Sequence, residues 1–267
     1  MTTTAIFGAG VMGETLVSGL IRSGRTPGDL VVTGRTPEKV NALAERHGVR
    51  VLANAEAADV ADTLVLCVKP QDMAALLDEL HDHVAPGNAV VSLAAGITTE
   101  FLESRLPEGT SVIRVMPNTP ALVDEGMAAI APGSHCDESH LAEAESLMAS
   151  TGKVLRIPEK QMDAVTAISG SGPAYIFFVV ESMIEAGVHL GLPRSTATEL
   201  VVQTLVGSAA MLRETGTHPV VLREQVTSPS GTTASALREL EIHRVRAAFL
   251  AAMEAARNRS RELAEEA

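Results

Sequence analysis

The chain has 267 residues, of which 46% are hydrophobic, and its formal net charge at pH 7 is −12. This length allows one large domain or two modest ones, and we expect two. A strongly negative surface repels nucleic acid and anionic lipid, so we expect neither as a partner. The two cysteines, Cys67 and Cys136, are too few for a disulfide framework, which favours a reduced compartment.

No targeting or membrane segment is expected. Only three threonines separate Met1 from the first apolar run, so the start does not resemble a secretory leader. No apolar stretch reaches the roughly 18 residues of a membrane span. We therefore expect a cytoplasmic protein without a membrane partner.

The first half alternates strand-like runs with helical patterns. The strand-like runs are TAIFG (4–8), LVVTG (30–34), TLVLCV (63–68), AVVSLAA (89–95), SVIRVM (111–116), MAAIA (127–131) and VLRI (154–157). Helical patterns begin near Gly10, Glu38, Gln71 and Thr99, and another opens at Asp137. This rhythm predicts an N-terminal α/β domain of the Rossmann type, with a doubly wound parallel sheet covered on both faces, over residues 1–160.

The second half, residues 161–267, is predicted to be an all-α domain. Residues 174–192 are apolar on nearly every side, which requires burial in a domain core or against a second subunit. Further helices are expected over 195–215 and from Thr232 toward Glu265, with a break near Ile242 and His243. So small a helical domain is expected to complete its core in a dimer.

The segment GAGVMG (8–13) fits the GxGxxG pattern between the first strand and the first helix. Gly8 permits a tight turn, Gly10 lets the backbone approach a pyrophosphate, and Gly13 lets helix and strand pack closely. In this context the pattern predicts dinucleotide binding, and the alternative is a purely structural glycine turn.

The end of the second strand indicates which dinucleotide binds. An acidic residue there would hold the ribose hydroxyl of NAD, but this chain has Gly34, Arg35 and Thr36. A guanidinium beside a hydroxyl suits a 2′-phosphate, so we expect NADPH, with NADH possible. Arg35 could instead cap a solvated turn, and Lys69 after the TLVLCV strand could serve the cofactor or be a surface lysine.

No strong acid or base stands out in the helical half. It has no lysine, since Lys160 is the last of the chain. Its histidines (His189, His218 and His243) suit surface or capping positions, and Tyr175 is the single tyrosine of the chain. A hydride acceptor that needs little proton transfer from the enzyme would explain this. An imine that arrives protonated is such an acceptor.

The segment VTSPSGTTASAL (226–237) precedes the last helical pattern. Backbone N–H groups and hydroxyls at a helix start suit a carboxylate, so this turn could orient a substrate that resembles an amino acid. The alternative is an ordinary N-cap supplied by Ser228 or Ser230.

Together these motifs resemble pyrroline-5-carboxylate reductase, the NADPH-dependent family of the last step of proline synthesis. The resemblance covers nearly the whole chain, through GAGVMG (8–13), VKPQ (68–71), RVMPNTP (114–120), TAISGSGPAYIF (166–177), GLP (191–193) and VTSPSGTT (226–233). It implies a Rossmann domain followed by a helical dimerisation domain, and a homodimer that assembles into a decamer. The implied reaction reduces 1-pyrroline-5-carboxylate, a small imino acid, to L-proline.

The resemblance also implies site residues, with no metal. The imino acid carboxylate is held by Ser228, Gly231, Thr232 and Thr233, and Thr233 is the candidate catalytic residue, as an orienting group. The cofactor is bound by Gly8, Ala9, Gly10, Val11, Met12, Gly13, Gly34, Arg35, Thr36, Asn54, Val68, Lys69, Pro70, Ala94, Ala95, Gly96 and Met116. The family usually has two glycines where this chain reads Pro229, Ser230 and Gly231, so its anion turn departs from the pattern.

Two other functions stay open. One is NADP-dependent reduction of a related imine or oxo acid. The other is a non-catalytic, dinucleotide-binding protein.

Overall fold

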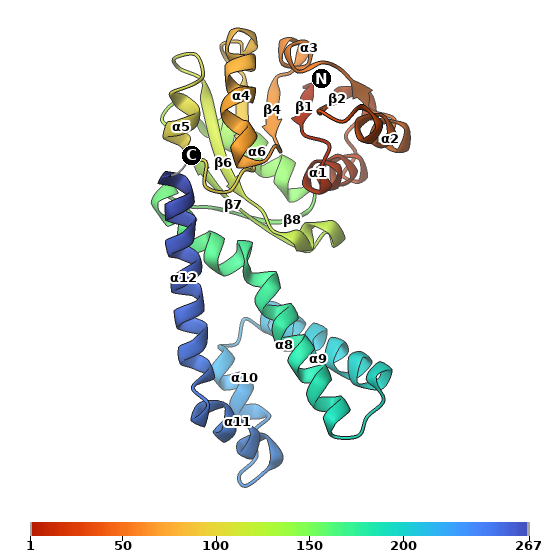
Figure 1. The fold of residues 1–267 in the computed structure, drawn as a ribbon, viewed down its shortest axis with the longest axis vertical. Coiled ribbons are helices and arrows are strands. Elements are labelled where there is room, and N and C mark those ends of the chain that lie inside the picture. Colours follow the sequence, from red (N-terminus) through yellow and green to blue (C-terminus); the bar gives the residue numbers. More distant parts are fainter. Residues whose placement is uncertain (1, 266–267) are drawn as a thin grey trace. The chain divides into compact units, whose positions relative to one another are not determined.

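The computed structural model describes residues 2–265, which form two compact units. The first unit joins Met1–Ser171 to Ala256–Ala267, and the second is Gly172–Ala255. The last helix, α12 (Val245–Glu265), therefore contributes to both (Figure 1). Our boundary between residues 160 and 161 stays a proposal about folding domains, since spatial contacts group residues 161–171 with the first unit.

An eight-stranded sheet forms the centre of the first unit, in the order β3-β2-β1-β4-β5-β6-β7-β8. Its strands are β1 (Thr4–Phe7), β2 (Leu30–Thr33), β3 (Arg50–Val51), β4 (Thr63–Leu66), β5 (Ala89–Ser92), β6 (Ser111–Met116), β7 (Gly126–Pro132) and β8 (Gly152–Arg156). Every neighbouring pair is parallel except β6 and β7, which are antiparallel. The predicted parallel sheet is wrong at this pair, because a connection as short as residues 117–125 reverses the chain and cannot make a parallel crossover.

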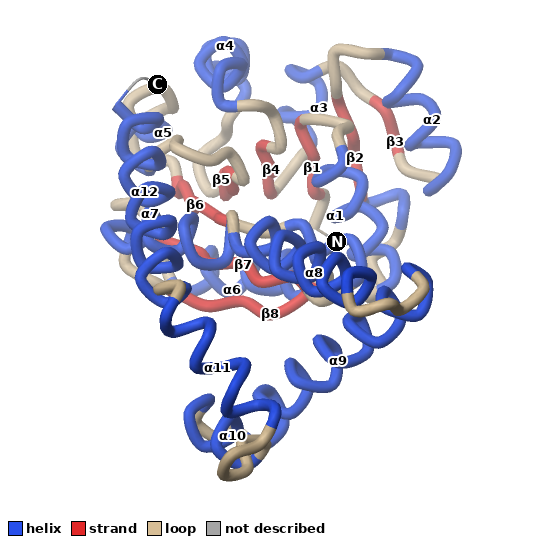
Figure 2. Tube along the Cα trace, turned by 60° about the horizontal axis from the view of Figure 1, so that its bottom comes forward, coloured by secondary structure: helices blue, strands red, loops and turns tan. Residues whose placement is uncertain are grey.

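Helices cover both faces of the sheet, as Figure 2 shows. One face packs against α1 (Val11–Arg22), α2 (Pro37–His47) and α6 (Glu138–Ala149). The other packs against α3 (Asn54–Val60), α4 (Pro70–Leu80) and α5 (Thr99–Glu103). Apolar side chains fill both layers, so the predicted doubly wound domain is confirmed.

The remaining elements of the first unit are short. They are the 3₁₀ turns η1 (Pro27–Asp29), η2 (His81–His83), η3 (Thr119–Val123) and η4 (Glu159–Gln161), the helix α7 (Met162–Val165) and the π-helical turn Thr166–Gly170. The strand and helix pattern did not predict the π-helical turn, which lies within the most specific motif of the chain. Such turns often occur at functional sites.

The second unit is helical throughout, as predicted. It contains α8 (Gly172–His189), α9 (Arg194–Thr215), α10 (Pro219–Gln225), α11 (Thr232–Ile242) and the start of α12. The break near Ile242 and His243 is confirmed, because α11 ends at Ile242 and Arg244 has a φ of 56°. The helix α10 was not predicted, and Pro219 at its first position begins it.

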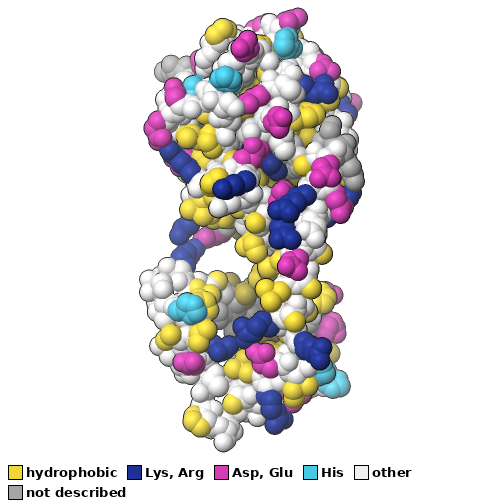
Figure 3. All heavy atoms as spheres, turned by 90° about the vertical axis from the view of Figure 1, so that its left-hand side faces the viewer, with side chains coloured by type: hydrophobic (Ala, Val, Ile, Leu, Met, Phe, Trp, Pro, Cys, Tyr) yellow, Lys and Arg dark blue, Asp and Glu magenta, His cyan; other side chains and the backbone are white. Residues whose placement is uncertain are grey.

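The second unit of a single chain has almost no buried core. Among residues 172–255, all of them described, Ala197 is the one buried residue. Large apolar side chains of α8 are exposed, including Phe178 at 70% and Leu190, just beyond the helix, at 81%. Yellow side chains on the face drawn in Figure 3 show that apolar surface is open to solvent. The single chain therefore does not bury α8, and a partner surface is needed.

One expectation about membranes needs correction. The continuous helical segment Glu159–His189 is long and apolar enough to cross a membrane by length and composition alone. We predicted no such segment, on the ground that no apolar stretch reaches roughly 18 residues. One helix of this kind is weak evidence for a membrane span, and a helix that pairs with another copy of the chain has the same composition.

A buried ion pair fixes η4 against the sheet of the first unit. The guanidinium of Arg114 in β6 is 4% exposed at the residue level and lies 3.3 Å from the Glu159 carboxylate. Glu159 also accepts a hydrogen bond of 2.7 Å from the Thr99 N–H and another from the Thr99 hydroxyl. One carboxylate thus joins β6, the start of α5 and η4.

We expect Glu159→Ala to lower the free energy of unfolding by about 3 kcal/mol, because it leaves a buried guanidinium unpaired. The matched control is Glu185→Ala, which removes the partner of Arg194 in an exposed pair and should cost under about 1 kcal/mol. Urea unfolding of both variants measures the difference. Equal losses would contradict the assigned role of Glu159.

Candidate active site

The glycine turn after β1 is held by contacts that exclude side chains. Gly8 has a φ of 120°, and its N–H donates to the Thr33 carbonyl at 3.1 Å. A Cβ at Gly8 would lie 2.9 Å from the Cys67 carbonyl oxygen, and one at Gly13 would lie 2.1 Å from the Gly8 oxygen. Both glycines are therefore required by the fold itself.

Gly10 is different, because the protein leaves space beside it. A Cβ at Gly10 would meet nothing within 4 Å. Gly10 is the N-cap of α1 and no side chain caps this helix, while the next residue, Val11, is 69% exposed. Uncapped N–H groups beside open space fit the phosphate of a dinucleotide, so these residues suit the predicted cofactor.

Loops after three neighbouring strands meet at this turn. A Cβ at Gly34, after β2, would lie 3.4 Å from the Ala9 nitrogen, so the turn of Gly34 to Thr36 packs on the glycine turn. The β4 loop reaches Gly8 through Cys67, and Lys69 is the N-cap of α4. The structure thus brings the predicted cofactor residues of three segments, 8–13, 34–36 and 68–70, to one edge of the sheet.

The predicted residues after β5 and β6 lie at the ends of the next two strands. Ala94 and Ala95 follow β5, and Gly96 has a φ of 80°. A Cβ at Gly96 would lie 3.5 Å from Leu263, so the end of α12 packs on this loop. Met116 is the last residue of β6, and its side chain packs against Gly170 of the π-helical turn. A Cβ at Gly170 would lie 2.4 Å from the methionine methyl group.

Two predicted cofactor residues have protein partners. Arg35 forms a pair of 2.7 Å hydrogen bonds with both carboxylate oxygens of Asp72, in the first turn of α4. The side-chain amide of Asn54 donates to Glu79 at 2.9 Å. Among the described residues, no hydrogen bond joins Asn54 to the other predicted cofactor residues. Sequence reasoning did not single out Asp72, although an acidic residue directly after VKPQ is a possible partner for a nearby arginine.

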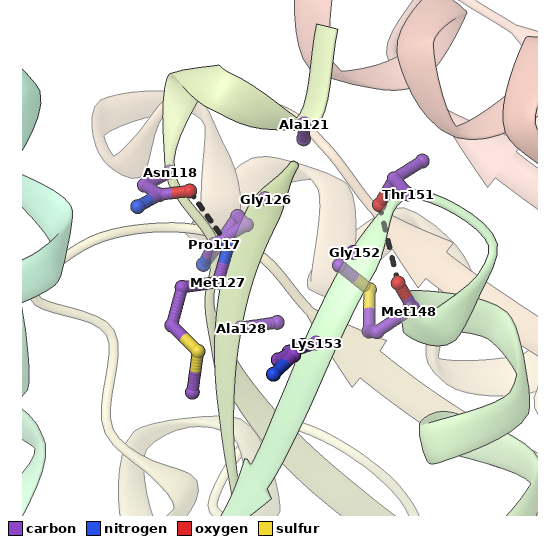
Figure 4. A pocket seen from close by; sticks show the side chains of 10 residues that line it. All are labelled: Pro117, Asn118, Ala121, Gly126, Met127, Ala128, Met148, Thr151, Gly152 and Lys153. Atoms are coloured by element: carbon purple, nitrogen blue, oxygen red, sulfur yellow. Dashed lines mark hydrogen bonds between the residues drawn. The ribbon is translucent and has the colours of Figure 1, made fainter. Parts of the chain in front are cut away.

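Asn118 is a second residue that sequence reasoning did not single out. Its amide donates to the Ser169 carbonyl at 3.0 Å, and its side-chain oxygen accepts from the Met127 N–H at 2.8 Å. Asn118 therefore ties the MPNTP turn to the π-helical turn and to β7. The pocket in Figure 4 is lined by Pro117 and Asn118 of this turn together with residues of β7 and β8, and none of the predicted site residues lines it.

The turn before α11 is also an uncapped helix start. The N-cap is Gly231, without a capping side chain, so neither Ser228 nor Ser230 caps α11 as the alternative supposed. The Gly231 N–H donates to the Ser228 carbonyl at 3.0 Å, and a Cβ at Gly231 would lie 2.4 Å from the Ser228 hydroxyl oxygen. Ser230, at the position where the family usually has glycine, has a φ of 61° in the left-handed region.

The hydroxyls of this turn are available for a ligand. Within residues 2–265, the hydroxyls of Ser228, Thr232 and Thr233 have no hydrogen-bond partner. Ser228 and Thr232 are exposed, and Thr233 is half-buried. Hydroxyls and backbone N–H groups together can bind a carboxylate, whereas neither can act as a strong acid or base.

Other candidate chemical groups are occupied or inert. Burial raises the pKa of the Cys67 thiol to about 12, so this cysteine beside the glycine turn is a thiol and not a thiolate at neutral pH. His218 caps α10 by accepting from the Val220 N–H, and His243 ends α11. The expectation that these two histidines take capping positions is confirmed.

Comparison with known proteins supplies the family. Residues 159–263 match the family model for pyrroline-5-carboxylate reductase dimerisation, and residues 3–96 match that of the NADP oxidoreductases described as coenzyme F420-dependent. A pyrroline-5-carboxylate reductase of Corynebacterium melassecola is 46% identical to this chain, over 98% of this chain and 99% of its own length. The chain belongs to the pyrroline-5-carboxylate reductase family.

Other reductases of this family agree with that result. The Escherichia coli (strain K12) pyrroline-5-carboxylate reductase is 38% identical over 96% of both chains. A Coxiella burnetii pyrroline-5-carboxylate reductase matches the fold with a TM-score of 0.93 at 38% identity, over 98% of both chains. A Plasmodium falciparum pyrroline carboxylate reductase with NADP bound has a TM-score of 0.89 at 30% identity, again over 98% of both.

Membership of this family accounts for the exposed helix α8. The matched dimerisation region contains α8 and most of α12. Self-association therefore explains why the second unit of a single chain lacks a buried core. Self-association is also a reason, other than a membrane, for an apolar helix of membrane-spanning length.

Substitution at the two helix-start glycines should separate folding from cofactor binding. Gly13→Ala should lower Tm, because its Cβ would collide with the Gly8 carbonyl. Gly10→Ala should leave Tm within about 2 °C, because nothing lies near its Cβ, but the methyl group should obstruct the cofactor and raise its Kd at least about tenfold.

Thermal unfolding and titration of NADPH fluorescence measure these two quantities. An unchanged NADPH Kd in Gly10→Ala would place the cofactor elsewhere.

Proposed function

We propose that this chain uses NADPH to reduce 1-pyrroline-5-carboxylate to L-proline, the last step of proline biosynthesis. The observation that carries the proposal is that the N-cap residue of α1 and that of α11 are both glycines, so no side chain caps either helix. In a member of this family, one uncapped start suits the pyrophosphate and the other suits the imino acid carboxylate. NADH is a second possible cofactor.

The first unit would hold the cofactor. Residues 8–13 would bind the pyrophosphate, and Gly34, Arg35 and Thr36 would meet the 2′-phosphate of NADPH. Asn54, residues 68–70, residues 94–96 and Met116 would line the rest of the molecule. Bound NADPH supplies the hydride that reduces the C=N bond.

The turn before α11 would hold the substrate. Ser228, Gly231, Thr232 and Thr233 would bind its carboxylate, with Thr233 also close enough to the ring nitrogen to orient it. The imine is reactive when protonated, so the residues of the turn need only position it, and this fits a turn without an acid or base. Positioning of two bound reactants can supply most of the rate acceleration.

We further propose that the assembly is a homodimer, which can form a decamer in the family manner, and that it works in the cytoplasm. The incomplete core of the second unit and the matched dimerisation region support the dimer. The net charge of −12 supports a protein that does not bind nucleic acid or an anionic membrane surface.

Oxidation of NADPH, followed by its absorbance, tests the function directly. The purified chain should oxidise NADPH in the presence of 1-pyrroline-5-carboxylate and form proline, with a lower rate for NADH. Faster turnover of a six-membered imine or an oxo acid would favour the related-reductase alternative. No oxidation with any of these would favour the non-catalytic, dinucleotide-binding alternative.

Thr233→Ala should raise the KM for the imino acid roughly tenfold, the loss of one hydrogen bond to a charged group, and leave the KM for NADPH within about twofold. The matched control is Thr227→Ala in the same loop. Its hydroxyl already donates to the Arg223 carbonyl at 2.6 Å, so both KM values should stay near those of the wild type. Equal effects of the two variants would contradict the role given to Thr233.

A further inference from the structure

The contact between Arg35 and Asp72 joins the loop after β2 to the first turn of α4. Nη1 and Nη2 of Arg35 each lie 2.7 Å from one oxygen of the Asp72 carboxylate. Two parallel hydrogen bonds between a guanidinium and a carboxylate are the strongest geometry for this pair. The same edge of a guanidinium is the one that binds phosphate with two hydrogen bonds.

The two partners are not equally mobile. The Arg35 side chain is 79% exposed, whereas that of Asp72 is 23% exposed. Asp72 belongs to a regular helix, where its N–H donates to the Lys69 carbonyl at 2.9 Å. Arg35 is thus a long, solvated side chain that reaches a carboxylate fixed in α4, and it can leave that carboxylate for another anion.

The pair changes how strongly the loop attracts a phosphate. Asp72 neutralises the charge of Arg35 and occupies its best binding edge. A 2′-phosphate that approaches Arg35 must displace the carboxylate or bind beside it, and two like charges at short range repel each other. An unphosphorylated ribose meets no such competition, because its hydroxyl carries no charge.

We propose that Asp72 is a specificity-determining residue that limits the preference for NADPH over NADH by competing with the 2′-phosphate for Arg35. The inference rests on the proposed binding of the 2′-phosphate by Arg35. Asp72 would weaken the binding of NADPH, which carries the 2′-phosphate, and leave the binding of NADH unchanged. Because Arg35 is largely solvated, the proposal gives Asp72 a role in cofactor selection rather than in folding.

Calorimetric titration of the full-length protein with adenosine 2′,5′-bisphosphate and with ADP tests the proposal without turnover. Asp72→Asn should lower the Kd for the bisphosphate about fivefold and leave that for ADP within about twofold. The matched control, Asp78→Asn, removes a carboxylate from the same helix that pairs with Arg105. It should change neither Kd, which separates local competition from a change in net charge.

The same titrations with Arg35→Ala separate the competition by Asp72 from the 2′-phosphate site at Arg35. Arg35→Ala should raise the Kd for the bisphosphate, and adding Asp72→Asn to this variant should then have no further effect. If Asp72→Asn alone leaves the Kd for the bisphosphate unchanged, or raises it, the competition is overturned while Arg35 keeps its role. If Arg35→Ala leaves this Kd unchanged, the proposed 2′-phosphate site is itself overturned.

Discussion

The helices α1 and α11 each have a glycine as N-cap residue, which offers no side chain to the first N–H groups of the helix. Gly10 before α1 has φ and ψ of −89° and −175°, and Gly231 before α11 has −78° and 174°. A serine, threonine or aspartate at these positions would accept from one of the donors and stabilise each helix by roughly a few tenths of a kcal/mol. The chain gives up that stability, and each helix start keeps unpaired donors and a partial positive charge for an external anion.

The second constraint is the incomplete core of the helical unit. Residues 172–255 leave large apolar side chains of α8 and α9 exposed in a single chain, which is costly in water at about 25 cal/mol for each Å² left uncovered. The matched dimerisation region gives the reason for this composition. The turn proposed to bind the substrate therefore belongs to a unit whose own packing is completed by self-association.

Strong local sequence patterns made much of the fold, and the position of the glycine turn, predictable. The spacing of Gly8, Gly10 and Gly13 was enough to predict the glycine turn between β1 and α1, and helical periodicity was enough for the break after Ile242. The antiparallel β7, the π-helical turn and the pairing of Arg35 with Asp72 were not predicted. The pairing joins residues far apart in sequence, whereas strand and helix periodicity alone signals neither the direction of β7 nor a π-helical turn. The uncapped state of α11 also required the structure, since Ser228 and Ser230 are good capping residues by composition.

The central claim is that the carboxylate of the imino acid, held at the start of α11, provides most of the substrate recognition. Steady-state oxidation of NADPH with 1-pyrroline, which has the same ring and imine but no carboxylate, tests this most directly against 1-pyrroline-5-carboxylate. The account predicts a kcat/KM at least about a hundredfold lower for 1-pyrroline, since a charged group in a site of hydrogen-bond donors is lost, with the KM for NADPH unchanged. A kcat/KM for 1-pyrroline within a few-fold of that for the carboxylated imine would contradict it.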